Sequence, residues 1–485
     1  MPRHALDGLE PALLWDYFSQ LSRIPRESKK ERAAGDFVVK VAKELGLEHA
    51  RDKAGNVVVR KPASPGHEGR PSVCLQSHLD MVCVKRNDKK HDFARDPITL
   101  LHEDGWVKAD GTTLGADNGI AVATNLAFMA DRSLEHGPLE LLFTVDEETG
   151  LTGAKALEPA LLKSRTLLNL DSEDEGVLTV GCAGGADTVA TWTLATDAAK
   201  AGSVALDVRV TGCLGGHSGV EIHTQRGNAI KMLTRVLVAL EAFDARVIKF
   251  EGGSKRNAIP AEAAARVAVP KAKVEEAKAA VQVMRGVLID EIRAIEPKLD
   301  VVVESVKGKP ARVWKRAFQR NVLRALQGLP HGVLKMSAAI PGLVETSTNV
   351  AVLTQTPKAL TLATSQRSLV ESERDEAADG ARAVLELSGA TVRPADPYPG
   401  WAPDMQSRIL ATAVRVHRDV FGREAEVVAI HAGLECGIIG KKIPGMDMVS
   451  LGPTIKGAHS PEERVDVGTV ERYWNYLLTI LRNVE

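Results

Sequence analysis

The sequence has few of the features that mark membrane, secreted or nucleic-acid-binding proteins. Its five cysteines are scattered without a C-x-x-C pair, so neither a disulfide framework nor a cysteine-based zinc site is expected. No uncharged apolar run is long enough to cross a bilayer, and the N-terminus lacks the basic and apolar regions of a secretory signal. Aromatic residues make up only 4% of the chain, which argues against a base-stacking surface. These absences predict a cytoplasmic protein.

Charge of either sign is not in excess. Lys and Arg number 62 against 63 Asp and Glu, for a formal net charge of -1. This balance gives no electrostatic reason to expect a nucleic acid or a membrane as a partner. With 485 residues and 44% hydrophobic residues, the chain is long enough for two globular domains.

Strand-like and helix-like segments alternate in the first part of the chain. SVCLQSHLD and LELLFTVDE are predicted strands, and DNGIAVATNLAFMA between them is a predicted helix. Such alternation is typical of an α/β layer sandwich with a largely parallel sheet. An earlier helix is predicted in SKKERAAGDFVVKVAKELG, with Ser28 as its N-cap.

The pattern changes at about Ala186. The segments that follow alternate with period two, which is typical of half-buried antiparallel strands, and the α/β pattern returns after a proline-rich stretch near residue 399. We therefore predict the first part of an α/β domain at 1–186, an inserted α+β domain at 187–399, and the second part of the α/β domain at 400–485.

Three acids end the apolar run of LLFTVDEETG. Like charges raise each other's pKa, so a buried strand that ends in this way needs solvent or a positive partner. If the strand continues through Glu147 and Glu148, their side chains point to opposite sides. One could then bind a metal ion while the other takes a proton from the attacking water. Solvated loop acids are the simpler interpretation.

Other candidate residues lie where predicted strands or loops end. His78 and Asp80 alternate at one strand end, and Asp171 ends another strand in LLNLDSEDEG. Asp117 lies in a glycine-flanked turn before a helix, and His459 lies in the loop of IKGAHSPEERV. Taken singly, each has a simpler explanation, such as a helix N-cap, a turn or an exposed loop histidine.

Taken together, these residues suit a two-metal hydrolytic site. Ligands of α/β sheets gather beyond the carboxyl ends of the strands, where two histidines and three carboxylates could hold two ions with one carboxylate shared. Mixed nitrogen and oxygen donors favour zinc or manganese over magnesium. In two-metal sites the ions, about 3.5–4 Å apart, clamp the nucleophile and the carbonyl.

Six ordered motifs then point to a family. They are SHLDM, GADNGI, DEETGLTGA, NLDSE, GGHSG and GAHSPEERV. They resemble those of the aminoacyl-histidine dipeptidases (Xaa-His dipeptidases, peptidase D or bacterial carnosinases) of the co-catalytic zinc exopeptidase clan. The resemblance covers essentially the whole chain. It implies a three-layer α/β/α catalytic domain with a largely parallel sheet at 1–186 and 400–485, and an inserted α+β lid and dimerisation domain at 187–399.

The resemblance also implies a metal ligand for each of five residues. His78 and Asp171 would bind one zinc ion, and Glu148 and His459 would bind the other. Asp117 would bridge the two ions.

Further roles are implied around these ligands. Asp80 would orient His78, and Glu147 would be the general base that deprotonates the water. His217 would reach the active site of the partner subunit and stabilise the oxyanion. The peptide bond of 117–118 would be cis.

Substrate-binding residues are implied as well. Asn257 and Arg367 would hold carbonyl and carboxylate groups of the substrate, because an Arg fork suits a terminal carboxylate. Glu435 would pair with the substrate's ammonium group. Polar alternatives in the same region are Arg256, Thr348 and Asn349.

The implied activity is hydrolysis of unblocked dipeptides, preferably Xaa-His dipeptides including carnosine. It would use two Zn²⁺ per subunit, for which Mn²⁺ or Co²⁺ could substitute, in a homodimer formed through the inserted domain. Alternatives that keep the site are a tripeptidase, a carboxypeptidase-like enzyme and an N-acyl amino acid deacylase. A non-catalytic binding protein on the same fold is the alternative of a different class.

Overall fold

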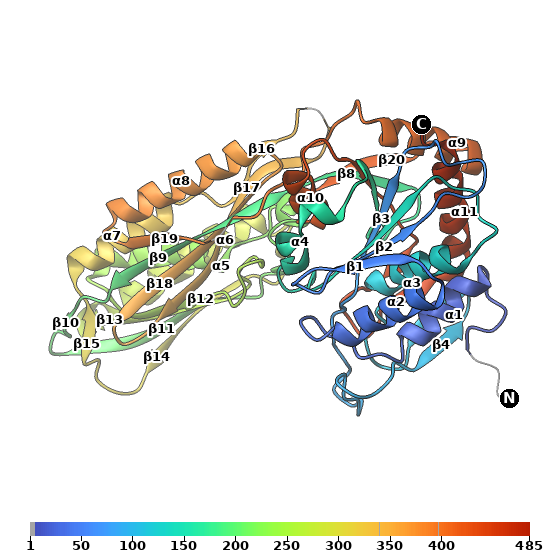
Figure 1. Cartoon of the computed structure of the whole chain (residues 1–485). Helices are drawn as coiled ribbons and strands as arrows, with labels where there is room; N and C mark the ends of the chain where they lie inside the picture. The colour runs from blue at the N-terminus through green and yellow to red at the C-terminus, as the bar shows by residue number, and fades with distance from the viewer. Residues whose placement is uncertain (1–4, 339, 396) are drawn as a thin grey trace. The chain divides into compact units, whose positions relative to one another are not determined.

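The computed structural model describes residues 5–338, 340–395 and 397–485. The chain forms two compact units, each with its own hydrophobic core. The first unit comprises Met1–Cys182, Trp401–Ala429 and Leu434–Glu485, and the second comprises Ala183–Gly400 and Ile430–Gly433. N-terminal and C-terminal segments, at the blue and red ends of the colour scale in Figure 1, thus fold together in the first unit.

A mixed eight-stranded sheet forms the centre of the first unit, in the order β1-β2-β6-β3-β7-β21-β8-β20. The central strands β6, β3, β7 and β21 run parallel, whereas the pairs β1–β2, β2–β6 and β21–β8 are antiparallel. The parallel strands that the sequence predicts therefore form the centre of the observed sheet. The strands are β1 (Glu48–Arg51), β2 (Val57–Lys61), β3 (Val73–His78), β6 (Leu139–Thr144), β7 (Thr166–Asn169), β8 (Val177–Cys182), β20 (Glu426–Ile430) and β21 (Asp447–Ser450).

Helices cover both faces of this sheet, as neighbouring residues of β6 show. Leu141 and Phe143 belong to a core shared with α1, α3, α9 and α11, whereas Leu142 belongs to a separate core shared with α4 and α10. Because successive side chains of a strand point to opposite faces, the unit has the predicted three α/β/α layers. The helices are α1 (Ala12–Leu21), α2 (Arg32–Glu44), α3 (Ala116–Ala130), α4 (Thr152–Ala156), α9 (Arg408–Phe421), α10 (Glu435–Lys442) and α11 (Val467–Asn483).

A small sheet lies beside the large one in the first unit. Its order is β22-β23-β5-β4, and its pairs are antiparallel. It joins a hairpin of the N-terminal part to the C-terminal segment that carries His459. The strands are β4 (Leu100–Glu103), β5 (Trp106–Ala109), β22 (Ile455–Lys456) and β23 (Arg464–Asp466).

Two local expectations are wrong. Helix α2 begins at Arg32, and Ser28 is not its N-cap, because the Ser28 hydroxyl instead donates to Asp80 Oδ2 at 2.8 Å. The strand predicted in LELLFTVDE, which would reach residue 147, ends at Thr144. The chain turns at Asp146, which has a φ of 51° and whose carboxylate accepts hydrogen bonds from two threonine hydroxyls of the turn.

The second unit is built on an antiparallel sheet in the order β14-β11-β13-β12-β17-β18-β9-β19, with β16 beside β17. Apolar residues of its strands form one core with the helices, which is the predicted α+β arrangement. The strands are β9 (Gly184–Thr193), β11 (Ser203–Thr211), β12 (Arg246–Gly252), β13 (Ala263–Pro270), β14 (Asp300–Val306), β16 (Gly332–Met336), β17 (Val344–Gln355), β18 (Ala359–Ser368) and β19 (Thr391–Pro394), and the separate pair β10 (Thr196–Ala198) and β15 (Arg312–Trp314). The helices are α5 (Ala229–Leu240), α6 (Val274–Ile292), α7 (Arg316–Gly328) and α8 (Glu371–Leu387).

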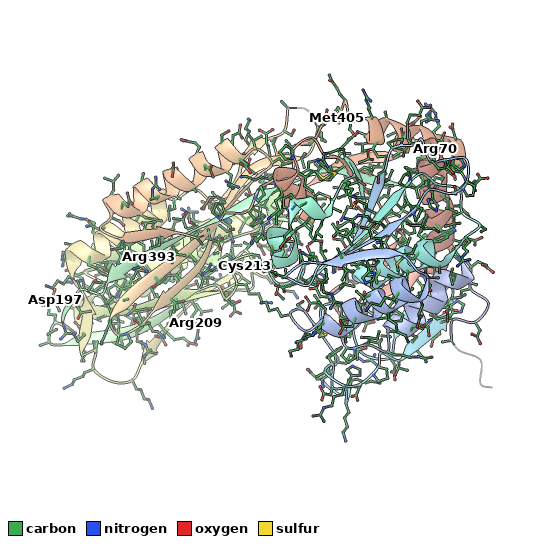
Figure 2. The ribbon with its side chains drawn as sticks, in the orientation of Figure 1. Arg70, Asp197, Arg209, Cys213, Arg393 and Met405 are labelled. Atoms are coloured by element: carbon green, nitrogen blue, oxygen red, sulfur yellow. The ribbon has the colours of Figure 1, made fainter. Side chains whose placement is uncertain are left out.

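The cysteines do not cross-link either unit. All five are free thiols, including Cys213, which is labelled in Figure 2. In the described part of the chain, every helix is too short or too polar to cross a membrane.

Candidate metal centre

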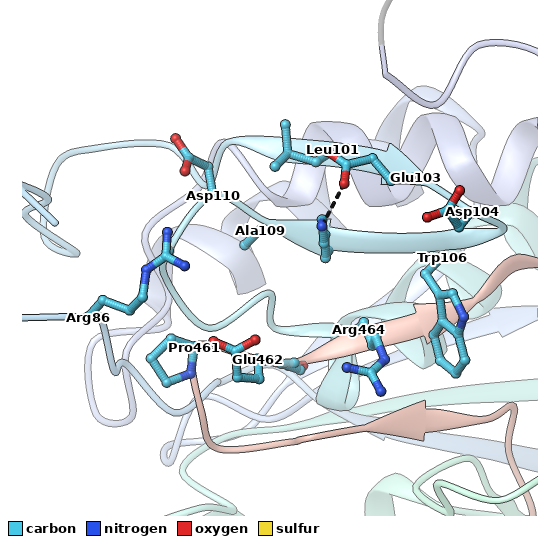
Figure 3. A pocket seen from close by; sticks show the side chains of 13 residues that line it. Arg86, Leu101, Glu103, Asp104, Trp106, Ala109, Asp110, Pro461, Glu462 and Arg464 are labelled. Atoms are coloured by element: carbon cyan, nitrogen blue, oxygen red, sulfur yellow. Dashed lines mark ion pairs between the residues drawn. The ribbon is translucent and has the colours of Figure 1, made fainter.

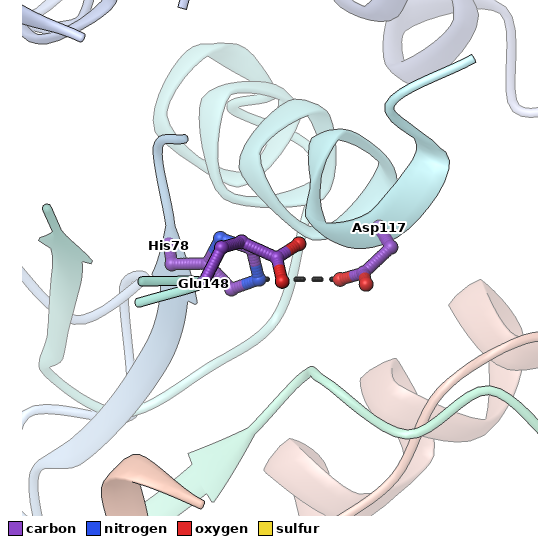
Figure 4. A group of neighbouring side chains, drawn as sticks. All are labelled: His78, Asp117 and Glu148. Atoms are coloured by element: carbon purple, nitrogen blue, oxygen red, sulfur yellow. Dashed lines mark hydrogen bonds and ion pairs between the residues drawn. The ribbon is translucent and has the colours of Figure 1, made fainter. Parts of the chain in front are cut away.

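Three of the predicted ligands meet at the carboxyl end of the central strands. His78 ends β3, Asp117 lies in the first turn of α3, and Glu148 follows β6. Figure 4 shows these three side chains facing one another, and one ligand atom from each lies within 4.8 Å of the others. Segments distant in the sequence thus deliver a histidine and two carboxylates to one place.

Asp117 connects two groups of side chains. Its Oδ1 lies 3.2 Å from His78 Nε2, and its Oδ2 lies 3.0 Å from His459 Nε2. Asp171 Oδ1 is 3.3 Å from His78 Nε2, and Glu148 Oε2 is 3.0 Å from His459 Nε2. The structure therefore brings all five predicted ligands together, as two histidine–carboxylate groups that share one carboxylate.

The backbone at Asp117 has an unusual conformation. Gly115 before it has a φ of 71°, which favours glycine, and the peptide bond between Asp117 and Asn118 is cis. The Asn118 side chain accepts a hydrogen bond from the His78 N–H at 3.2 Å and donates one to the Leu170 carbonyl at 2.8 Å. Asn118 thereby ties the start of α3 to the ends of β3 and β7.

Asp80 joins His78 to the turn that follows β6. Its Oδ1 lies 3.4 Å from His78 Nδ1. The backbone N–H groups of Glu147 and Glu148 donate to the same carboxylate at 3.0 and 3.2 Å. Fully buried, Asp80 is placed to fix the ring of His78, the kind of support that metal-binding histidines need.

The electrostatics of this centre favour positive charge. Hydrogen bonds to Asp117 and Glu148 raise the pKa of His459 to about 11. Although burial opposes it, the carboxylates of Asp171 and Asp117 raise the pKa of His78 well above its usual range. Both imidazoles are thus surrounded by carboxylates, in places where a divalent cation would reverse the local pKa preferences.

The carboxylates respond to the same crowding. Burial raises the pKa of Asp171 to about 6. Burial also raises the pKa of Glu147 well above its usual range, and the carboxylates of Asp171, Glu435 and Glu148 act in the same direction. Acids held this close together need a cation to be ionised together.

The donor set fits two divalent cations. Glu148 Oε1 is buried and has no hydrogen-bond partner in the described part of the chain, so a ligand atom is left free. Imidazole nitrogens and carboxylate oxygens are donors that zinc and manganese accept. His78 and Asp171 could hold one ion, Glu148 and His459 the other, and Asp117 both.

Glu435 lies at the start of α10 and is fully buried. Its Oε2 accepts hydrogen bonds from Gln76 Nε2 and Thr144 Oγ1, both at 2.6 Å. Its Oε1 is buried without a hydrogen-bond partner among the described residues, and burial raises the pKa of the carboxyl to about 8. The predicted ammonium partner therefore has one oxygen committed to the protein and one free.

His217, Asn257 and Arg367 belong to the second unit. His217 Nδ1 accepts hydrogen bonds from the N–H groups of Gly219 and Val220, at 3.3 and 3.0 Å, and the Asn257 carbonyl accepts one from the residue after His217 at 2.8 Å. Burial, with Arg367 nearby, lowers the pKa of His217. Because Nδ1 accepts these two bonds, Nε2 is the ring nitrogen placed to donate a proton to an oxyanion.

Arg367 on β18 differs from the alternative Arg256. The Arg367 side chain is 8% exposed, its Nη1 donates to Tyr398 Oη at 2.9 Å, and its Nε is buried without a partner in the described ranges. Arg256 is exposed and pairs with Asp187 at 3.1 Å. Of the two, Arg367 is therefore the buried guanidinium with an N–H donor left free.

The cavity drawn in Figure 3 is separate from these side chains. It measures about 250 Å³ and is lined by the β4–β5 hairpin and residues 461–464, without any of the five predicted ligands. In its wall, Lys108 pairs with Glu103 at 2.7 Å, and the Arg464 guanidinium lies 5.0 Å from the Trp106 ring centre.

The sequence interpretation missed the residues that hold the ligand segments together. Arg26 and Glu463 bond to backbone groups far away in the chain. Glu463 shares the HSPEE motif with His459, which is the one available signal. No local pattern marks Arg26.

Comparisons with known proteins identify the family. Residues 74–483 match peptidase family M20/M25/M40. The chain is 42% identical over 480 residues to the cytosol non-specific dipeptidase of Escherichia coli (strain K12), and the match covers 99% of both chains. The crystal structure of aminoacylhistidine dipeptidase from Vibrio alginolyticus matches with a TM-score of 0.90 and 42% identity, over 99% of this chain and 98% of that one. An aminopeptidase of Bacillus cereus shares the fold, with a TM-score of 0.57 and 16% identity over 98% and 99% of the two chains. The chain therefore belongs to peptidase family M20/M25/M40 and is a metal-dependent hydrolase of peptide bonds.

Proposed function

We propose that this enzyme hydrolyses unblocked dipeptides, with a preference for Xaa-His dipeptides such as carnosine. The observation that carries the proposal is the pair of histidine–carboxylate groups joined through Asp117. The two relatives at 42% identity are named as a dipeptidase and an aminoacylhistidine dipeptidase, and both match over nearly their whole length. These names support the substrate class.

The proposed cofactor is a pair of Zn²⁺ ions per subunit, for which Mn²⁺ or Co²⁺ could substitute. Bound at the five ligands, such ions polarise a carbonyl and lower the pKa of water. The free Glu148 oxygen and the carboxylates gathered around the Nε2 atoms of both histidines support this occupancy.

Glu147 is the proposed general base. Its carboxylate would take a proton from the attacking water and pass it to the leaving amine. Burial raises the pKa of this carboxyl, which makes its carboxylate a stronger proton acceptor. Asp80 would orient His78 and, through the N–H of Glu147, the base as well.

Residues that bind the substrate are proposed in both units. His217 would donate from Nε2 to the oxyanion in the active site of the other subunit. The free donor of Arg367 would bind the substrate carboxylate, Asn257 a carbonyl, and the free oxygen of Glu435 the ammonium.

The proposed assembly is a homodimer. Residues 187–399 would form its interface and serve as a lid over the substrate. We further propose a cytoplasmic location, which the name of the Escherichia coli relative supports.

A substrate panel tests this function. Metal-stripped protein is reloaded with Zn²⁺, Mn²⁺ or Co²⁺ and given carnosine, other Xaa-His dipeptides, dipeptides without histidine, tripeptides and N-acetylated dipeptides. We expect the free dipeptides to be cleaved, those with C-terminal histidine fastest, and the acetylated ones to resist because they lack the ammonium. Preferred cleavage of tripeptides or acylated substrates would favour the alternatives, and no cleavage of any peptide by the loaded protein would favour a binding protein.

A further inference from the structure

One buried carboxylate organises the turn that carries Asp117. The Glu463 side chain, 2% exposed, accepts hydrogen bonds from four consecutive backbone N–H groups. Its Oε2 accepts those of Leu114 and Gly115 at 2.8 and 2.9 Å, and its Oε1 accepts those of Ala116 and Asp117 at 2.7 and 3.2 Å. Four charge-assisted bonds to one rigid group fix both the position and the direction of this turn.

A buried guanidinium contacts the same turn together with a second ligand segment. Arg26 is 2% exposed. Its Nη1 donates to the carbonyls of Leu79 and Asp80 at 3.1 and 2.9 Å, and its Nη2 donates to the carbonyl of Gly115. The planar fork therefore spans the end of β3 and the turn before α3 at once.

We infer that Glu463 and Arg26 are positioning residues of the metal centre. Glu463 lies four residues after His459 in one loop, so its bonds bring that loop to the turn of Asp117. Arg26 brings the same turn to the segment of His78. Neither residue reaches a ligand side chain, and both act through the backbone. Together they position the backbone segments of three of the five predicted ligands relative to one another, before an ion is bound.

This inference rests on the proposed two-metal site and differs from a role in stability alone. A buried carboxylate that accepts backbone N–H bonds stabilises any fold. Glu140 on β6 is such a group: it is 2% exposed and accepts bonds from the N–H groups of Lys163 and Ser164 at 2.9 and 2.8 Å. Those residues carry no ligand, so Glu140 is a matched control.

The test compares full-length, metal-stripped wild type with the Glu463→Gln and Glu140→Gln variants. Zn²⁺ affinity is measured by competition with a chromophoric chelator, and the unfolding temperature is measured without metal. We expect both variants to unfold at lower temperature, but only Glu463→Gln to bind Zn²⁺ more weakly, by about 10–100-fold. Equal Zn²⁺ affinity in the two variants would overturn the inference. Failure of the wild type to bind Zn²⁺ would instead contradict the proposed function.

A second variant keeps the inference testable if Glu463→Gln does not fold. Arg26→Lys retains the charge, but a single ammonium cannot replace a fork that reaches three carbonyls. Its control is Arg60→Lys, because Arg60 also donates to a carbonyl, that of Leu161 at 2.7 Å, away from the ligands. We expect weaker Zn²⁺ binding in Arg26→Lys only, and unchanged binding would contradict its role.

Discussion

Glu147 and Glu148 are adjacent in the chain but have different surroundings. Glu148 Oε2 lies 3.0 Å from His459 Nε2. Burial and the surrounding acids raise the pKa of the Glu147 carboxyl. Strand alternation does not separate them, because β6 ends at Thr144. The turn after β6 separates them, and the N–H groups of both residues donate hydrogen bonds to the Asp80 carboxylate. That the two side chains differ in surroundings could be predicted from the sequence, but the turn that separates them could not.

Replacing Glu147 by glutamine tests this division. The amide cannot accept the proton of the attacking water, so we expect kcat to fall about 100- to 10,000-fold. The Zn²⁺ content should stay at the wild-type value because the five ligands are intact. Glu158→Gln, at an exposed position, is the control and should keep full activity. Normal turnover by Glu147→Gln would refute its role as base.

At the scale of elements, the strands that deliver ligands were predictable. β3 and β6 are buried at every position, and such apolar runs ending in polar residues predict parallel strands with a site at their ends. The hydrogen bonds between elements were not predictable. Arg26 bonds to Gly115 and Glu463 to Asp117 across long stretches of sequence, and Ser28 bonds to Asp80 where local rules predict a helix cap.

The contact between α4 and the turn after β6 gives an element-scale prediction. Gly153 donates its N–H to the Val145 carbonyl at 2.9 Å, and a Cβ at this glycine would overlap that carbonyl oxygen and lie 2.6 Å from Asn56 Oδ1. Gly153→Ala should therefore lower the free energy of unfolding by about 1–3 kcal/mol. It should also reduce kcat, because Glu147 and Glu148 lie in the displaced turn.

Gly150→Ala is the matched control in the same turn. Among the described residues, a Cβ there would meet only the Thr152 methyl group within 4 Å, at an ordinary 3.5 Å. Urea unfolding of the metal-free protein and initial rates measure both variants. Equal behaviour of the two alanine variants would show that the close approach at Gly153 does not hold the turn.

At the scale of the whole molecule, the candidate residues are divided between the two units. The five predicted ligands and Glu147 lie in the first unit, and His217 and Arg367 lie in the second. The change from α/β to period-two patterning indicated two kinds of domain, because strand burial differs between parallel and antiparallel sheets. The expectation that His217 reaches the partner's site came from the resemblance and not from residue patterns, because such a contact depends on surfaces that meet only in an assembly.

Mixing two inactive variants tests whether His217 acts across a dimer. Glu147→Gln lacks the base and His217→Ala lacks the oxyanion donor, so each homodimer should be inactive. After subunit exchange, a heterodimer would contain one site with both native groups, and random mixing should restore about a quarter of wild-type activity. No recovery despite exchange, or full activity in a 52.0 kDa monomer, would contradict the proposed assembly.

The metal content of wild type and of Asp117→Ala shows whether five side chains hold two ions through one shared carboxylate. Both proteins are purified without chelator, and metal per chain is measured by mass spectrometry. We expect two divalent ions per wild-type chain and the loss of both in Asp117→Ala, since each ion loses a ligand. Two ions retained by Asp117→Ala, or none in active wild type, would contradict it.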